Sequence, residues 1–348
     1  MSVLITGSAG FIGFHLARRL LDEGTCVIGV DDHNPYYDPA LKAAREAQLL
    51  ASAHYVPVRG GIETPGLMSD LMQRHRPSVL VHLAAQAGVR HSIEAPGNYV
   101  AANLVGTFHV LEAARAFPPD HLLIASSSSV YGGSGGLPCR ETDCTDMPLS
   151  FYAATKKACE AMAHSYAALY ALPITMLRFF TVYGPWGRPD MAPFLFTSAL
   201  FGDRPIPLFN HGRLRRDFTY IDDLVEAVRA LIEVVPRHPA APVPGDSLSP
   251  VAPWRVVNIG QGQPIALIDF IEALQQAAGR SARLDLLPMQ PGDVEATWAD
   301  TSLLQRLIGS RKQTPLALGM QRYVGWFASH YPEAPALPQD GRVLKRHT

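Results

Sequence analysis

The stretch Ser2-Val3-Leu4-Ile5-Thr6-Gly7-Ser8-Ala9-Gly10-Phe11-Ile12-Gly13 decides how the chain is expected to fold. Its apolar, β-branched start predicts a buried strand, and the glycines predict a tight turn into a helix over Phe11–Glu23. The turn needs glycine because its backbone must approach a diphosphate closely and the helix must pack against the strand. Free N–H groups at the helix start attract an anion. We therefore predict a dinucleotide-binding turn formed by Gly7, Ala9, Gly10, Phe11, Ile12 and Gly13.

Strands and helices alternate along the first half of the chain. The predicted strands are Ser2–Thr6, Cys26–Asp31, Tyr55–Val58, Ser78–Leu83, His121–Ser126 and Ile174–Phe180. The predicted helices between them are Phe11–Glu23, Thr64–His75, Gly97–Phe117 and Phe151–Tyr170. Because the strands are almost continuously apolar, we expect a parallel sheet covered on both faces. The predicted fold class is α/β, a doubly wound (Rossmann) sheet.

The alternation breaks after Tyr183, where prolines, glycines and arginines accumulate around one good helix, Phe194–Phe201. A helix over Asp222–Val235 and a strand over Arg255–Ile259 then return to the first pattern, and the proline-rich stretch between them is expected to be a surface loop. We predict a Rossmann domain of residues 1–180 to which 218–262 return, a smaller interleaved α/β substrate domain of 181–217 and 263–334, and a tail of 335–348.

Composition excludes several classes of protein. With 47% hydrophobic and 18% charged residues among 348, the chain can bury a sizeable core. Thirty basic against thirty-one acidic residues argue against nucleic acid as a partner. We find no apolar run of the roughly 18 residues that span a membrane, no basic segment typical of a signal peptide, and no histidine spacing typical of a metal site. Four cysteines form no disulfide framework, so we expect a cytoplasmic protein without a metal or a membrane partner.

Asp31 ends the second predicted strand, 18 residues beyond Gly13. A carboxylate about 20 residues after a glycine motif of this kind accepts hydrogen bonds from the adenosine ribose. It would repel the 2′-phosphate of NADP, and no arginine follows before Arg45. The predicted cofactor is therefore NAD.

Tyr152 and Lys156 lie one helical turn apart on one face of a predicted helix. A phenol with an ordinary pKa of about 10 is a poor base at neutral pH, and a nearby ammonium group stabilises the phenolate. Ser126–Ser129 stand where a strand ends, at the sheet edge where ligands bind. If the strand stays extended, Ser127 and Ser129 share a face and can donate to a sugar hydroxyl and to the phenol oxygen.

Five motifs together resemble the extended short-chain dehydrogenase/reductase family, the NAD-dependent epimerases and dehydratases, over residues 2 to about 330. They are the glycine turn, His82-Leu83-Ala84-Ala85, Ser126-Ser127-Ser128-Ser129-Val130-Tyr131-Gly132, the Tyr152–Lys156 spacing and Arg178-Phe179-Phe180-Thr181-Val182-Tyr183-Gly184-Pro185. Within the family the chain is most similar to UDP-glucuronate 4-epimerases, through Val30–Asp38, Ala84–Arg90, Trp186–Met191 and Arg216–Asp223.

The resemblance implies a transient oxidation at C4 of a UDP-sugar. Tyr152 takes the proton of the 4-hydroxyl, Lys156 supports it and holds the nicotinamide ribose, and Ser127 occupies the catalytic serine/threonine position. Leu83, Ala84, Ala85 and Ile62 would line the cofactor site. Arg216 matches an arginine on the diphosphate, and Asp293 matches a carboxylate near the uridine ribose. Relatives pair through their two long helices, so the resemblance also implies a homodimer.

One departure concerns the adenine. The family usually has an acidic residue after the third strand, where this chain has Arg59-Gly60-Gly61-Ile62-Glu63. Gly61 has no side chain to make that contact, so adenine binding is expected either to be looser or to depend on Ile62 packing and on backbone groups.

A glucuronyl group carries a carboxylate that needs a partner when buried. Arg188 is the predicted partner, because a guanidinium binds a carboxylate through two parallel hydrogen bonds. Thr181, Ser127, Ser128 and Ser129 are expected to add donors, and Arg90 is the next candidate.

Two related reactions and one different class remain as alternatives. UDP-glucuronate decarboxylases carry a glutamate immediately before the Val-Tyr-Gly motif, where this chain has Ser129. UDP-hexose 4-epimerases differ at Thr181, where they have asparagine, and at Gln290, where they have arginine. A non-catalytic NAD-binding scaffold typically loses the tyrosine or the lysine, and both are present here.

Overall fold

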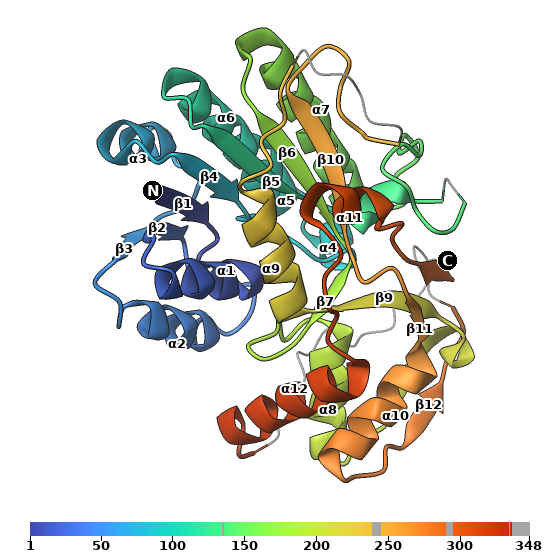
Figure 1. Ribbon diagram of the computed structural model, residues 1–348. Coiled ribbons are helices and arrows are strands. Elements are labelled where there is room, and N and C mark those ends of the chain that lie inside the picture. Colours follow the sequence, from blue (N-terminus) through green and yellow to red (C-terminus); the bar gives the residue numbers. More distant parts are fainter. Residues whose placement is uncertain (134–135, 239–244, 290–294, 334, 336–348) are drawn as a thin grey trace.

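A seven-stranded parallel sheet forms the larger part of the computed structural model, which describes residues 1–133, 136–238, 245–289, 295–333 and 335 (Figure 1). Its strand order is β10-β6-β5-β4-β1-β2-β3. The strands are β1 Ser2–Thr6, β2 Cys26–Asp31, β3 Tyr55–Arg59, β4 Val79–His82, β5 His121–Ser127, β6 Ile174–Phe179 and β10 Trp254–Ile259. All neighbours pair in parallel. The predicted doubly wound α/β class is confirmed.

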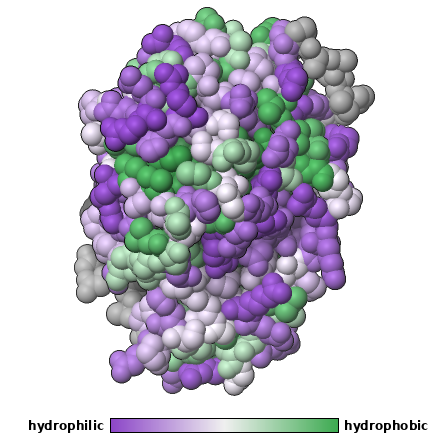
Figure 2. Space-filling view, turned by 60° about the vertical axis from the view of Figure 1, so that its left-hand side comes forward, coloured by the Kyte–Doolittle hydropathy of each residue, from purple (hydrophilic) through white to green (hydrophobic). Residues whose placement is uncertain are grey.

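Helices cover both faces of this sheet because both faces of its strands are apolar. Leu4 and Ile28 point to one face, where α3 Leu67–His75, α6 Gly106–Ala116 and α7 Phe151–Tyr170 close one hydrophobic core. Val3 and Ile5 point to the other face, which is covered by α1 Phe11–Asp22 and α9 Ile221–Leu231. On the surface drawn in Figure 2, hydrophilic residues dominate and the hydrophobic ones gather in separate patches.

A smaller part lies beside the carboxyl ends of the strands, at the bottom of Figure 1. One of its sheets joins β7 Thr181–Tyr183, β9 Arg215–Tyr220, β11 Pro264–Ala266 and β13 Ala296–Thr297, and the other pairs β8 Ile206–Leu208 with β12 Leu284–Leu286. Its helices are α8 Ala192–Phe201, α10 Leu267–Ala278 and α12 Leu316–His330, while α11 Ser302–Ile308 packs on α9 and β10. Phe218 of β9 stacks on Phe270 of α10 at 4.0 Å between ring centroids.

The chain crosses between the two parts several times. The boundary proposed between residues 217 and 218 falls inside β9, which belongs by its pairing to the small sheet. The chain re-enters the larger part with α9, and β10 then joins the main sheet. At the start of the predicted tail, the Pro335 carbonyl accepts a hydrogen bond from Ser198. The rest of that tail lies outside the described residues.

Helix α2, Pro39–Leu49, was missed by the sequence analysis. Its start carries ordinary signals, since Asp38 caps the N–H of Ala40 and Pro39 occupies the first turn. Its buried face, however, includes Lys42 and Arg45 beside two leucines, so the apolar period that reveals a helix is broken.

The single helix predicted over Gly97–Phe117 is divided in the structure. The short helices α4 His91–Glu94 and α5 Pro96–Tyr99 lead into a π-helical segment, Val100–Val105, before α6 begins. Within the π-segment Asn103 is buried and donates to the Gln86 carbonyl and to Thr155 Oγ1. Such segments are frequent near functional sites.

A buried ion pair fixes the end of β5. Arg178 of β6 donates to both carboxylate oxygens of Glu160 on α7, at 2.9 and 2.8 Å, and both side chains are 3% exposed. Ser126 donates to the same Glu160 carboxylate at 2.6 Å. The pair therefore ties β5, β6 and α7 together immediately before Ser127.

We expect Glu160→Gln to lower the free energy of unfolding by about 3 kcal/mol, because it leaves the Arg178 charge buried without a counter-charge. Urea denaturation measures the loss. Glu233→Gln is the control, since Glu233 is 63% exposed in its pair with Arg229 and such surface pairs contribute at most about 1 kcal/mol. Equal, small losses in both variants would show that the buried pair does not hold this region.

Candidate active site

One long cleft opens at the carboxyl edge of the sheet, as expected for an open α/β fold. Its described lining comes from the residues that directly follow the strands. They are Gly7 after β1, Asp31 and Asp32 at β2, Gly60–Glu63 after β3, Leu83–Val89 after β4, Ser126–Ser129 at β5 and Phe179–Val182 at β6 and β7. Tyr152 and Lys156 of α7 and Arg188 also line it.

The glycine turn has the geometry that a diphosphate needs. Gly7 has φ +75°, and a Cβ there would lie 2.8 Å from the Ala84 nitrogen. A Cβ at Gly13 would overlap the Gly7 carbonyl oxygen. Gly10 caps α1 without a side-chain hydrogen bond, so the first N–H groups of the helix remain available to an anion.

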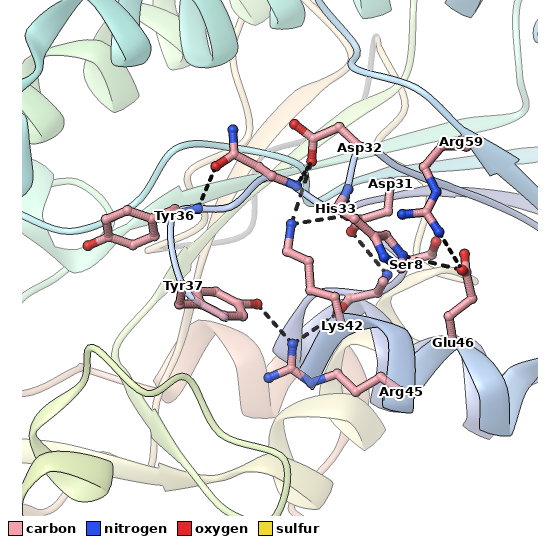
Figure 3. Close-up of polar contacts among 12 residues, drawn as sticks. Ser8, Asp31, Asp32, His33, Tyr36, Tyr37, Lys42, Arg45, Glu46 and Arg59 are labelled. Atoms are coloured by element: carbon pink, nitrogen blue, oxygen red, sulfur yellow. Dashed lines mark hydrogen bonds and ion pairs between the residues drawn. The ribbon is translucent and has the colours of Figure 1, made fainter. Parts of the chain in front are cut away.

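Asp31 is buried at the end of β2 and lines the cleft. Its Oδ2 accepts from the Ala9 N–H at 3.1 Å, and its Oδ1 accepts from the His33 N–H and from Lys42 Nζ (Figure 3). An ionised carboxylate offers about four acceptor positions, so one remains for a ribose hydroxyl.

Lys42 is a lining residue that sequence reasoning missed. Its ammonium group lies 3.1 Å from Asp31 and 3.5 Å from Asp32 (Figure 3). Two carboxylates around one ammonium group leave this end of the cleft negative, so the predicted preference for a ribose without a 2′-phosphate still follows. The capping signal at Asp38 could have revealed the helix that carries Lys42.

Arg45 was also missed as a functional candidate. It is fully buried, and Nη1 donates to the Ala9 carbonyl and to Tyr37 Oη, both at 2.9 Å. Its Nη2 donates to the Trp186 carbonyl at 2.7 Å. The backbone of Ala9 is therefore hydrogen-bonded on both sides, through its N–H to Asp31 and through its carbonyl to Arg45. Ala9 is not among the residues that line the cleft.

The predicted catalytic groups meet where β5 ends. Tyr152 lines the cleft and its ring lies 6.1 Å from that of Tyr99. Lys156 is buried and donates to the Ala125 carbonyl at 2.9 Å. Burial, and then the positive charge of Lys156, lower the pKa of the neighbouring His82 to about 3. Lys156 is therefore flanked by a neutral imidazole.

The serine run is not one extended strand, as the face argument assumed. The strand ends at Ser127, and Ser128–Tyr131 form a 3-10 turn. Ser127 Oγ accepts from the Ser129 N–H at 3.1 Å and donates to Ser129 Oγ at 3.2 Å. The two hydroxyls therefore stay adjacent through the turn, and Ser127, Ser128 and Ser129 all line the cleft.

Arg188 lines the same cleft as Thr181 and the serines. It is 22% exposed and forms a bidentate ion pair with Asp190, in which Nε donates at 3.0 Å and Nη2 donates at 2.5 Å. Tyr36 donates to Asp190 at 3.1 Å. Burial acts to lower the pKa of Arg188, but the Asp190 carboxylate outweighs it and the pKa rises. Neither Tyr36 nor Asp190 was identified from the sequence.

Two predicted substrate residues, Arg90 and Arg216, lie apart from this group, and a third is not among the described residues. Arg90 is exposed, and its guanidinium covers the Phe209 ring at 5.2 Å. Arg216 donates to the Arg215 and Glu295 carbonyls in the small sheet. Neither is among the residues that line the cleft. Asp293 lies outside the described residues, as does Gln290.

Neither a metal site nor a membrane-spanning helix is found among the described residues. No group of three or more His, Cys, Asp or Glu side chains among them could hold a metal ion. Within the same part of the chain, every helix is too short or too polar to cross a membrane.

Comparison with known proteins gives the family. The model of the NAD-dependent epimerase/dehydratase family matches residues 3–242. The chain belongs to this family. Members of this family depend on NAD, so NAD is the cofactor to be placed in the cleft.

Individual relatives are similar over nearly the whole chain. A probable UDP-glucuronate 4-epimerase of Rhizobium meliloti is 49% identical over 96% of this chain and 99% of its own length. UDP-glucuronate 4-epimerase 4 of Arabidopsis thaliana is 42% identical over 95% of this chain and 76% of its own. The crystal structure of UDP-glucuronic acid 4-epimerase from Bacillus cereus with UDP-glucuronic acid and NAD is 33% identical, with a TM-score of 0.85 over 95% of this chain and 100% of that one.

Proposed function

We propose that this chain is a UDP-glucuronate 4-epimerase that interconverts UDP-glucuronate and UDP-galacturonate. The observation that carries the proposal is the set of side chains at the sugar end of the cleft. There Tyr152 and Lys156 are joined by Ser127, Thr181 and Arg188. This set combines a proton acceptor with a guanidinium group suited to a carboxylate. The similarity to UDP-glucuronate 4-epimerases over nearly the full length supports it.

The residues present fit NAD. The turn at Gly7, Gly10 and Gly13 leaves no room for a Cβ where a diphosphate approaches. Asp31 suits the adenosine ribose, and Ile62, Leu83, Ala84 and Ala85 line the walls between. When bound, NAD accepts a hydride from C4 of the sugar and returns it to the opposite face.

The chain's own residues move the proton. Tyr152 takes the proton from the 4-hydroxyl and returns it after the 4-keto sugar has rotated in the site to present its opposite face. The Lys156 ammonium group, held by the Ala125 carbonyl, favours the phenolate and holds the nicotinamide ribose. With the sugar bound, Ser127 turns its single O–H from Ser129 to the C4 oxygen, and Ser129, whose Oγ lies 3.2 Å from that of Ser127, is the second donor.

The sugar carboxylate has a specific partner in Arg188. Asp190 takes Nε and one hydrogen of Nη2, which leaves the edge formed by Nη1 and Nη2 for a second carboxylate. Holding that carboxylate matters because the 4-keto intermediate is a β-keto acid. If its C5–C6 bond aligned with the keto group, carbon dioxide would leave, and the bonding electrons would form an enolate that takes a proton at C5.

The alternatives lack support at this end of the cleft. Among the described lining residues the carboxylates are Asp31, Asp32 and Glu63, all after β2 and β3. Ser129 lines the cleft at the position where, by resemblance, a UDP-glucuronate decarboxylase carries its glutamate. A scaffold without turnover would not need Tyr152 and Lys156 together in a cleft.

The UDP end of the substrate is assigned by resemblance. We propose that Arg216 binds the diphosphate and that Asp293 contacts the uridine ribose, while Arg90 stays the second candidate for the sugar carboxylate. The small sheet that carries Arg216 borders the cleft through β7, which supports this placement. We propose a cytoplasmic location, because Cys26, Cys139 and Cys159 are free thiols, as expected in a reducing compartment.

The direct test is incubation of the purified protein with UDP-glucuronate and chromatographic detection of UDP-galacturonate. We expect Tyr152→Phe to bind both NAD and UDP-glucuronate but to turn over about 10² to 10⁴ times more slowly, the usual contribution of a positioned acid/base. Tyr170→Phe removes a hydroxyl from an exposed tyrosine of the same helix and is the control. A Tyr152→Phe rate near that of the parent would contradict the proton-transfer role.

Arg188→Ala is expected to lose about 2–4 kcal/mol of binding or transition-state stabilisation with UDP-glucuronate, because the sugar carboxylate loses its charged partner. Residual turnover is expected to release more UDP-pentose products. Chromatography of the reaction mixture measures both, and Arg237→Ala, at an exposed arginine after α9, is the control. Full activity without extra decarboxylation would move the carboxylate contact elsewhere, with Arg90 the next residue to test.

We also propose a homodimer formed through the helical surface around α6 and α7. Large apolar side chains are exposed along this surface, where a monomer gains nothing from them. They are Val100, Val105, Phe108, Phe151 and Leu169, each 39–70% exposed.

Light scattering coupled to size-exclusion chromatography is expected to give the mass of two chains. Phe108→Glu is expected to give the mass of one, because a charge would be buried in the interface. Leu286→Glu, at an exposed leucine of β12, is the control and is expected to stay dimeric. A monomeric parent, or a dimeric Phe108→Glu variant, would contradict this interface.

A further inference from the structure

The end of β3 carries an arrangement that the proposed function does not use. Gly60–Glu63 follow this strand and line the cleft next to Asp31. The Gly60 N–H donates to the Asp31 carbonyl at 3.1 Å, so this segment continues directly beside the proposed ribose site. A base attached to that ribose would lie against Gly61, Ile62 and Glu63.

The Glu63 side chain folds back over Gly61. A Cβ added at Gly61 would lie 2.7 Å from the Glu63 carboxyl carbon and 2.7 Å from its Oε2. The carboxylate of residue 63 therefore fills the space into which a side chain of residue 61 would project. This placement is possible because residue 61 is glycine.

The Glu63 carboxylate is not held there by another side chain. Within the described residues it has no hydrogen bond and no ion pair, since Lys42 pairs with Asp31 and Arg59 pairs with Glu46 of α2. It is partly buried and lines the cleft. A carboxylate in this setting gains from a hydrogen-bond donor on a ligand.

Ile62 supplies the other half of a base site. It is 4% exposed, lines the cleft and packs against Gly106 at the start of α6. Adenine has apolar faces and an edge with an exocyclic amino group, which donates hydrogen bonds. An apolar wall with a carboxylate at its side suits adenine, because the carboxylate can accept a hydrogen bond from the amino group. A base with a carbonyl oxygen in place of the amine would place two hydrogen-bond acceptors against each other, which is unfavourable.

We propose that Glu63 accepts a hydrogen bond from the adenine amino group of the bound dinucleotide, in the space left open by Gly61. This inference rests on the proposed placement of NAD in the cleft, and it is independent of which sugar is the substrate. It adds a side-chain contact to those expected from Ile62 and from backbone groups.

Long-range charge acts in the opposite direction, which makes the proposal testable. The dinucleotide is anionic through its diphosphate, so removing a nearby carboxylate favours its binding by simple electrostatics. A loss of NAD affinity in Glu63→Ala would therefore report a direct contact. The matched control is Asp70→Asn, which removes an exposed charge on nearby α3, outside the cleft lining.

The experiment is calorimetric titration of the full-length protein with NAD and with nicotinamide hypoxanthine dinucleotide, in which a carbonyl oxygen replaces the amine. We expect the parent to prefer NAD by about tenfold or more, since a hydrogen bond to a charged group contributes about that much and a mispaired acceptor adds a penalty. Glu63→Ala is expected to reduce this ratio to about one. Glu63→Gln is expected to relax it as well, because an amide pairs with either base edge.

A transfer of the carboxylate completes the test. Gly61→Asp combined with Glu63→Ala places an acid at residue 61 in the vacated space, and we expect it to restore the preference for NAD. An unchanged ratio in Glu63→Ala, an equal shift in Asp70→Asn, or a parent without preference would overturn the role of Glu63. Failure of the parent to bind NAD at all would instead overturn the proposed cofactor site.

Discussion

The approach of helix α1 to the turn after β1 is the constraint on which the site depends. A Cβ at Gly13 would overlap the Gly7 carbonyl, and a Cβ at Gly7 would meet the backbone of Ala84 after β4. The helix N-terminus can therefore reach the floor of the cleft. Because β1, β2, β4 and β5 are parallel strands of one sheet, their ends bring Asp31, the cleft walls and the serine run to the same edge.

Arg45 extends this constraint to the sugar end. It is buried, and its hydrogen-bond acceptors in the described structure are neutral oxygens, so several bonds must offset the cost of removing its charge from water. These bonds join the Ala9 carbonyl of the glycine turn to the Trp186 carbonyl, two residues before Arg188. The proposed diphosphate and carboxylate sites therefore share one rigid support.

Features with a periodic pattern or a fixed spacing could be predicted from the sequence. Contacts made by long polar side chains were missed. The apolar strands, the glycine turn, Asp31 and the Tyr152–Lys156 pair all carry a local signal, and the doubly wound fold followed from them. Helix α2 was missed because Lys42 and Arg45 occupy its buried face. The Asp190 and Glu63 carboxylates could not be placed either, because their positions depend on a neighbouring loop and on the absence of a side chain at Gly61.

The loop after β2 connects recognition at the two ends of the cleft. It begins at Asp31 in the proposed ribose site, and five residues later Tyr36 donates to Asp190, which holds Arg188. Asp190 neutralises much of the Arg188 charge, so in the proposed complex an oriented guanidinium edge contributes more to binding the sugar carboxylate than a strong positive potential does. Orientation is what the reaction needs here, because a 4-keto intermediate keeps its carboxylate only while the C5–C6 bond is held out of line with the keto group. An arginine fixed from behind by a carboxylate meets that need better than a free cation, which would bind the substrate without fixing its geometry.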